Sequence, residues 1–369
     1  MGPISNYDIV VFDMEDALID QGISLGTAIS MAADAYLTSF VGVRPDGGPL
    51  YPTEEVKAFA AANGFEPDAD LLHVLLVQAL GSLSADLAED DFDGMEGRDL
   101  MAALRQGGKV TESLGDLVRR KNLSEVGRQI RSKGGGKRGF QRLRAGRNRW
   151  LAMAEGHIMM DNFVRRFLAK SYLGTEMFTQ VHGQPPQFVI GEGAIGLETS
   201  WIDLSGLNAI RKRCPMAAVT RRTQAEAQYV LRKLEMHGLL DVVVGLGAMG
   251  MGMATEDESS WIRTLGVTDN ADAEYSTKVA EAIERVRIQE GIETMMRVAY
   301  VGSALPENRG ISMLKERYRV TVIGTAFGQD RKLVPTQREH GADHAVADPG
   351  ELLRVLSERP RPRSGSEYR

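Results

Sequence analysis

The chain has 369 residues, of which 43% are hydrophobic and 25% are charged, and its formal net charge is -6. This composition is typical of a globular protein and excludes wholesale disorder, and the length indicates two domains or one domain with a large insertion. The single cysteine, Cys214, excludes a disulfide framework and a multi-cysteine metal site.

The start of the chain does not resemble a targeting segment. Its first apolar stretch, residues 9–12, is only four residues long and is followed at once by acidic residues. No stretch approaches the roughly 20 apolar residues of a membrane span. We therefore expect a cytoplasmic protein without membrane contact.

Alternating strand and helix patterns occupy the two ends of the chain. Residues 8–12 form a β-branched run typical of a buried strand. About two hundred residues later the alternation resumes, with strands predicted over 216–220, 241–245, 298–302 and 320–324 and helices over 276–290 and 311–317. This order predicts a parallel sheet covered on both faces, that is, an α/β fold.

A long, mainly helical region interrupts this alternation after the first strand. Its clearest helices are predicted over residues 25–35 and 162–172. We therefore expect an α/β core made of residues 1–22 and 200–358, and a helical domain over 23–199 inserted in it. Residues 359–369 mix Pro, Arg, Ser and Gly and predict a disordered tail.

Charge is unevenly distributed along the chain. From Arg119 to Arg149 there are twelve Lys and Arg residues and one acid, Glu125, so this segment carries +11 and the remainder -17. Base-stacking aromatic residues are scarce, so nucleic-acid binding is not expected and a solvated helix face is the simpler interpretation. An acidic protein partner, or the chain's own acidic run over residues 86–96, are the alternatives.

Parallel sheets place functional residues at the carboxyl ends of their strands. These ends are followed by Asp13, Met14 and Glu15 after the first predicted strand, by Arg221 after Thr220, which ends the second, and by Ser303 after the fourth.

The segment 12–20, Phe-Asp-Met-Glu-Asp-Ala-Leu-Ile-Asp, resembles the first motif of the haloacid dehalogenase superfamily, in which phosphatases read F-D-M-D-G-V-L. Thr220 at the end of a strand, the Tyr-Val-Gly of residues 300–302 and the last strand and helix near residues 341–353 agree with that family in order and spacing. The resemblance covers roughly residues 7–356. It implies a Rossmann-like core with a helical cap domain.

The resemblance also implies a chemistry and a set of site residues. Asp13 would be the nucleophile that forms an aspartyl-phosphate, and Glu15 would be the acid/base. Thr220, Arg221 and Lys278 would hold the phosphoryl group, and of the two residues that follow Thr220 either Arg221 or Arg222 could bind an anion through two hydrogen bonds. Mg2+ would be bound by Asp13, Glu15, Ser303 and Glu307.

Several positions depart from the family pattern. Glu15 replaces an Asp, and the added methylene moves the carboxylate by about 1.5 Å, where a misplacement near 1 Å can cost on the order of a hundredfold in rate. The usual phosphate-binding Lys is replaced within residues 270–274, and Lys278, two turns on, is a possible substitute but is more typical of a solvated helix residue. Ser303 stands in place of a metal-binding Asp and is a poor neutral ligand.

These observations predict a phosphohydrolase scaffold that acts on a small phosphorylated metabolite, with weak or retuned activity. The alternative is a catalytically silent pseudo-phosphatase that serves as a binding or structural subunit. A complete G-x-G-x-x-G at Gly245–Gly250 after a strand is also typical of dinucleotide binding, but the acidic residues that follow it and its late place in the sheet favour a Gly/Met loop instead.

Overall fold

A computed structural model describes residues 7–65, 67–83, 110–144, 163–183, 191–246, 271–302, 311, 314–328 and 333–357. These residues divide into two compact units. The first, called the core unit here, comprises the described parts of residues 1–20, 199–255 and 266–369, and the second, the insert unit, comprises those of residues 21–198. Within the described ranges, no helix combines the length and apolar character that a membrane crossing requires.

The core unit is built on a six-stranded sheet with the order β5-β4-β1-β6-β7-β8. All of its neighbouring strands pair in parallel. The predicted parallel α/β fold is therefore confirmed. The strands are β1 (Ile9–Asp13), β4 (Met216–Thr223), β5 (Val242–Leu246), β6 (Arg297–Gly302), β7 (Arg319–Thr325) and β8 (His344–Val346).

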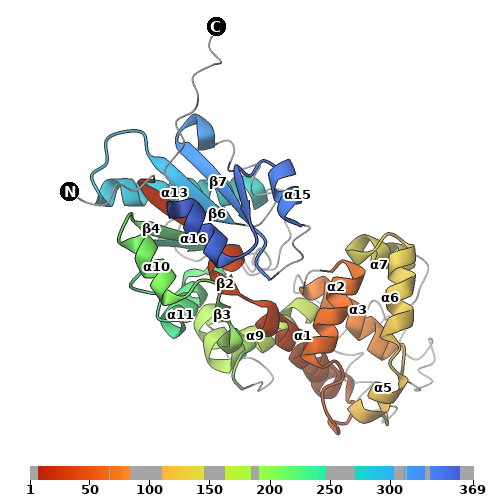
Figure 1. Cartoon of the computed structure of the whole chain (residues 1–369). Coiled ribbons are helices and arrows are strands. Elements are labelled where there is room, and N and C mark those ends of the chain that lie inside the picture. Colours follow the sequence, from red (N-terminus) through yellow and green to blue (C-terminus); the bar gives the residue numbers. More distant parts are fainter. Residues whose placement is uncertain are drawn as a thin grey trace. The chain divides into compact units, whose positions relative to one another are not determined.

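Helices cover both faces of this sheet (Figure 1). Ile9 and Val11 of β1 pack against α13 (Ala271–Gln289), whereas Val10 lines a small cavity with α10 (Leu204–Arg211) and α16 (Pro349–Ser357). This alternation is what a strand buried on both faces requires. The remaining helical elements of the core unit are α11 (Gln224–Lys233), α15 (Leu333–Glu339) and the 3-10 turn η5 (Leu314–Glu316).

The chain leaves and re-enters the core unit through a short antiparallel pair. A π-helical turn, η1 (Met14–Leu18), follows β1 directly and leads into β2 (Ile19–Asp20). β2 pairs with β3 (Thr199–Ser200), on the returning chain. The insertion thus begins within a few residues of the carboxyl end of β1.

The insert unit is helical, with its own apolar core. After α1 (Gly22–Ala35) and the π-helical turn η2 (Tyr36–Val41) come α2 (Thr53–Asn63), α3 (Ala69–Leu80), α5 (Leu114–Arg120), α6 (Leu123–Ser132), α7 (Gly136–Arg144), α9 (Phe163–His182) and the 3-10 turn η4 (Ala194–Leu197). The rings of Tyr36, Phe40 and Phe167 pack with centroids 5.1–6.1 Å apart. Helix α9 is kinked at Gly174, where φ is 72° and a Cβ would lie 2.2 Å from the backbone nitrogen of Gly193.

Candidate functional site

Asp13 lies at the carboxyl end of β1, between β4 and β6. It is the last residue of β1 and is paired in register with Val219 of β4, while Phe12 is paired with Val301 of β6. A Cβ added at Gly302, the end of β6, would lie 2.9 Å from the Asp13 Cβ. The small residue at position 302 therefore makes room for the Asp13 side chain.

Both oxygens of the Asp13 carboxylate accept hydrogen bonds. Asp13 is 2% exposed; the Glu15 backbone N–H donates to its Oδ1 over 3.0 Å, and the Tyr275 hydroxyl donates to its Oδ2 over 2.6 Å. Burial, together with the nearby Asp13 charge, raises the pKa of the Tyr275 hydroxyl well above its usual value. Tyr275 therefore stays protonated and fixes the orientation of the carboxylate.

Glu15 is held by two residues of β4. The Arg222 Nε donates to Glu15 Oε1 over 2.9 Å, and the Thr220 hydroxyl donates to the same oxygen. The Thr220 oxygen in turn accepts from the Arg222 backbone N–H over 3.0 Å. The Arg222 side chain is 4% exposed, whereas that of Glu15 is 18% exposed. These three residues form one hydrogen-bonded group, called the Glu15 network here.

The Glu15 network depends on a feature of β4 that the sequence analysis did not predict. The expectation that this strand ends at Thr220 is wrong, because β4 continues to Thr223 and its register with β5 shifts between Val219 and Thr223. Beyond Thr220 the side chains alternate, so that Arg221 is exposed and Arg222 is buried. Such irregularities redirect side chains next to functional sites, and here the alternation turns Arg222 toward Glu15.

Helix α13 brings further predicted and unpredicted groups near the strand ends. The Arg221 guanidinium lies 5.5 Å from the centroid of the Tyr275 ring, in cation–π geometry. Lys278 follows one turn after Tyr275 on this helix and is 4% exposed. The expectation that Lys278 is a solvated helix residue is therefore wrong. Residues three apart share a helix face, so Tyr275 and Lys278 lie on the same side of α13.

The other predicted positions are only partly described. Ser303, Glu307 and residues 247–250 of the glycine pattern lie outside the described residues, so the predictions made for them stay predictions. Gly245 has a packing explanation, since a Cβ there would lie 2.8 Å from the Arg222 carbonyl oxygen. Close approach of β5 to the end of β4 thus accounts for the first glycine of that pattern.

The described residues do not by themselves fit a bound Mg2+. Glu15 is paired with a buried guanidinium, both oxygens of Asp13 already accept hydrogen bonds, and no cluster of three or more metal-ligating side chains occurs in the described part of the chain. Mg2+ requires near-octahedral oxygen coordination. A metal would therefore need ligands from residues that the structure does not describe.

Sequence reasoning gives Tyr275 no role and gives Arg222 a different one. Tyr275 lies about 260 positions from Asp13 and one residue before the helix predicted over 276–290, and no motif includes it. Arg222 is expected only as a possible anion clamp, whereas the structure pairs it with Glu15. If the alternation of side chains along the strand is continued past Thr220, Arg222 falls on the buried side.

Comparisons with known proteins agree with this fold. No protein-family model matches the chain, and no curated protein sequence matches it. The X-ray structure of the structural-genomics target ZR25 aligns with a TM-score of 0.63 at 13% identity, covering 95% of this chain and 98% of that chain. The fold of the whole chain is thus one that occurs in solved structures.

Haloacid dehalogenase-like proteins are also among the similar solved structures. The haloacid dehalogenase-like hydrolase SP0104 from Streptococcus pneumoniae aligns at 11% identity and a TM-score of 0.39, covering 95% of this chain and 99% of that one. A putative beta-phosphoglucomutase from Thermotoga maritima aligns at 14% identity and a TM-score of 0.37, covering 95% and 98%. Superpositions this loose carry no inference about activity.

The chain is a Rossmann-like α/β protein with a helical insertion after its first strand. This arrangement is the fold that the sequence analysis expected, a parallel-sheet core interrupted after its first strand by a helical insertion.

Proposed function

We propose that this chain is a phosphohydrolase of the haloacid dehalogenase type that acts slowly on a small phosphate monoester through an aspartyl-phosphate on Asp13. One observation carries the proposal: a buried, oriented carboxylate lies at the carboxyl end of the central strand β1, between β4 and β6. Function in parallel α/β sheets is concentrated at this edge. Arg221, on the adjacent strand, and the buried Lys278 supply positive charge for the phosphoryl group.

The proposed reaction has two steps. One Asp13 oxygen attacks phosphorus, the bond from phosphorus to the ester oxygen breaks, and the departing alkoxide takes a proton from solvent water. Water then attacks the phosphorus of the aspartyl-phosphate, which releases inorganic phosphate, a proton and the Asp13 carboxylate. Tyr275 and the Glu15 backbone N–H hold the carboxylate in place for the first step.

Slow turnover follows from the Glu15 network. A general acid must reach the leaving oxygen within hydrogen-bond distance, but Glu15 Oε1 is held by Arg222 and Thr220. Glu15 would have to release these partners to transfer a proton. Thr220 likewise directs its hydroxyl proton to Glu15 and would have to turn to bind a phosphoryl oxygen.

The same network supports the alternative that the chain is a catalytically silent phosphate-binding or structural protein. In that case the Arg222–Glu15 pair is a permanent structural contact and no aspartyl-phosphate forms. The two functions differ in turnover and not in binding, because the cations proposed to bind phosphate, Arg221 and Lys278, are the same in both.

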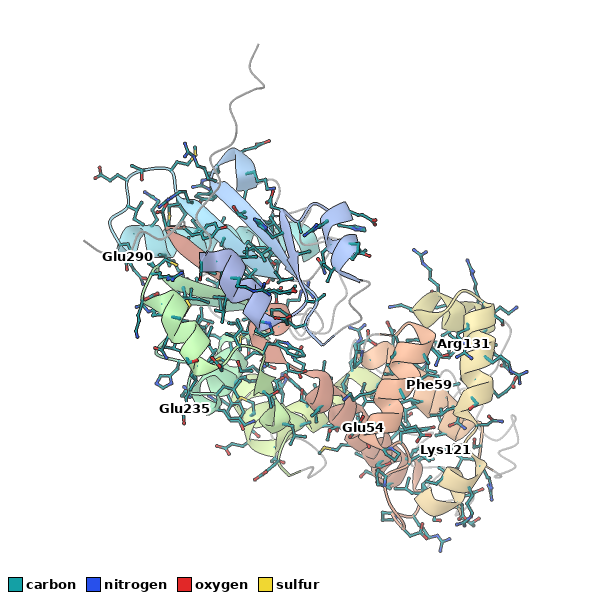
Figure 2. All side chains as sticks on the ribbon, in the orientation of Figure 1. Glu54, Phe59, Lys121, Arg131, Glu235 and Glu290 are labelled. Atoms are coloured by element: carbon teal, nitrogen blue, oxygen red, sulfur yellow. The ribbon has the colours of Figure 1, made fainter. Side chains whose placement is uncertain are left out.

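Hydrolysis of an aryl phosphate by the full chain tests the proposal, with and without added Mg2+, Mn2+ or Co2+. We expect slow phosphate release that Asp13→Asn abolishes. Glu235→Gln is the control, since Glu235 (labelled in Figure 2) is an exposed carboxylate between α11 and the start of β5, and the starts of parallel strands lie at the end of the sheet away from Asp13. Absence of turnover under all conditions, with phosphate binding retained, would establish the silent alternative, and turnover that survives Asp13→Asn would refute the mechanism.

A further inference from the structure

The strongest charged surface of the insert unit is a helical hairpin. It consists of α6 (Leu123–Ser132), the Gly134–Gly136 turn and α7 (Gly136–Arg144), and is called the basic hairpin here. Residues 123–144 contain seven Lys and Arg and one acid, a net charge of +6 in a chain whose total is -6. The net charge of the hairpin is therefore positive, whereas the net charge of the rest of the chain is negative.

Most of these cations are on the surface. The exposed residues of the hairpin include Arg128, Arg131, Lys133, Lys137, Arg138 and Arg142. Two of them form ion pairs, Arg128 with Glu125 and Lys137 with Asp70, and both pairs are partly exposed. Arg131 and Arg142 donate instead to neutral oxygens, of Asn63 and of the Lys133 backbone. For Lys133 and Arg138, no carboxylate partner occurs among the described residues. The positive charge of the hairpin is thus only partly compensated within the unit.

The turn between the two helices leaves this charge accessible. Gly134, Gly135 and Gly136 all have positive φ, at 109°, 72° and 50°. A side chain at these positions would be strained, so the turn carries none. Lys133 and Arg138 flank the turn and are exposed, and Figure 2 labels Arg131 one turn earlier, on α6.

The residue types exposed on the hairpin discriminate between two kinds of anionic partner. A protein interface needs an apolar centre, usually with aromatic anchors. None of the large exposed hydrophobic side chains in the described residues belongs to residues 123–144, where Ile130 and Phe140 are buried. Contacts to a sugar-phosphate backbone need only cations and small polar groups, and they carry no sequence information.

We propose that the basic hairpin binds the phosphate backbone of a nucleic acid without sequence preference. The scarcity of aromatic residues was the reason not to expect nucleic-acid binding from the sequence. That scarcity argues only against stacking on bases, and contacts to the phosphate backbone do not require stacking. Lys133 and Arg138 are the residues expected to contact phosphate most directly, because they are exposed and flank the side-chain-free turn. This inference does not depend on phosphatase activity.

Fluorescence anisotropy of labelled duplex DNA and duplex RNA of about 30 base pairs, titrated with the full chain, tests this proposal. We expect binding at micromolar protein in low salt, with an affinity that falls steeply as salt increases, because each phosphate contact releases counterions. Similar affinities for DNA and RNA would indicate backbone contacts, whereas a large preference for one duplex would mean recognition of a feature other than phosphate and would contradict the proposal as stated.

The test uses two double variants. The hairpin variant carries both Lys133→Gln and Arg138→Gln, and the control variant carries both Lys212→Gln and Arg213→Gln. Lys212 and Arg213 are adjacent exposed cations at the end of α10 in the core unit, so both double variants remove the same charge. The hairpin variant should bind at least tenfold more weakly and lose about two units of the slope of log affinity against log salt, and the control should bind like the unchanged chain.

Three outcomes would overturn the proposal. The first is no binding at 100 µM protein in 50 mM salt, and the second is an equal loss of binding in both double variants. The third is tighter binding of polyglutamate than of duplex at equal charge concentration, which would make an acidic protein surface the partner. Melting temperatures and far-UV circular dichroism of both variants establish that the substituted proteins are folded.

Discussion

At the scale of single residues, the Arg222–Glu15 pair has the largest expected effect on both stability and chemistry. Arg222 is buried, and its guanidinium donates to a carboxylate that is only partly exposed. Removing one partner of such a pair leaves a desolvated charge without compensation. The pair therefore links the stability of the core unit to the position of the predicted acid/base.

Arg222→Met removes the guanidinium and keeps an unbranched side chain. We expect it to lower the free energy of unfolding by about 2–3 kcal/mol, which is below the cost for a fully buried pair because Glu15 is partly solvated. Urea denaturation of Arg222→Met, Glu15→Gln and the double variant measures the coupling. A coupling energy below about 0.5 kcal/mol would show that the two side chains do not interact in the folded protein.

Tyr275→Phe tests the hydrogen bond that orients Asp13. The variant removes a buried donor and leaves the ring in place, so we expect a loss of about 1–2 kcal/mol in stability and a lower rate of any Asp13-dependent hydrolysis. Tyr318→Phe is the matched control, because the Tyr318 hydroxyl also donates to a carboxylate, that of Glu284, away from the strand ends. Equal effects of the two variants on the rate of hydrolysis would show that the Tyr275 hydroxyl has no specific role at Asp13.

At the scale of elements, the extended end of β4 is the feature on which the site depends. β5 approaches it so closely that a Cβ at Gly245 would lie 2.8 Å from the Arg222 carbonyl oxygen and 3.2 Å from the Gln224 nitrogen. Both contacts are with the backbone, which cannot move aside without disturbing the strand pair. The end of β4 and the Glu15 network are therefore coupled to the packing of β5.

Gly245→Ala is expected to destabilise the core unit by on the order of 1–3 kcal/mol, because it overpacks a site lined by backbone. Gly238→Ala is the control, since a Cβ at Gly238 would have no neighbour within 4 Å. The melting temperatures of the two variants, measured by thermal unfolding, are compared. If Gly245→Ala is as stable as the control, packing does not explain this glycine, and the interpretation of residues 245–250 as a dinucleotide-binding loop gains weight.

The sequence predicted the elements better than their ends. Runs of β-branched and apolar residues placed the centres of β1, β4, β5, β6 and β7, because burial on both faces leaves a signal in every residue, whereas the two-residue strands β2 and β3 were not predicted. The last residues of β4 carry no such signal, since a Thr-Arg-Arg-Thr series is equally typical of a loop. Lys278 was misassigned for a related reason: a lysine on a polar helix is normally solvated, and only the tertiary structure shows that it is buried.

Residues brought together from distant parts of the chain were the least predictable. Asp13 and Glu15 could be assigned by motif, but Tyr275 reaches Asp13 only because α13 covers the face of the sheet toward which Asp13 points. No pattern within α13 encodes that contact. The sequence therefore predicted the site residues that belong to one motif, and it missed the residues that reach the site only through tertiary packing.

At the scale of the whole molecule, the insert unit should have its own dependence on pH. Burial raises the pKa of Asp34 in α1 to about 6, with the hydrogen bond from the Leu50 backbone N–H acting in the opposite direction. The folded unit thus binds this proton more tightly than the unfolded chain does. The resulting stabilisation is complete below the unfolded pKa of about 4 and is lost as the pH rises through about 6.

Asp34→Asn keeps an oxygen acceptor for the Leu50 N–H and cannot ionise. We expect it to increase the free energy of unfolding by on the order of 1–3 kcal/mol at pH 7.5 and to have little effect at pH 4.5. Asp116→Asn should have the opposite sign at pH 7.5, because hydrogen bonds from Ser113 lower the pKa of the Asp116 carboxyl to about 2. An equal effect of Asp34→Asn at both pH values would contradict the assignment of the pH dependence to this residue.

The most direct test of the account is to look for the phosphoryl group on Asp13. The full chain is mixed with an aryl phosphate, quenched in acid during turnover, digested and analysed by mass spectrometry. We expect one added phosphoryl group on the peptide that contains Asp13, and none in Asp13→Asn. Phosphate release without that labelled peptide, or a phosphoryl group on any other residue, would contradict it.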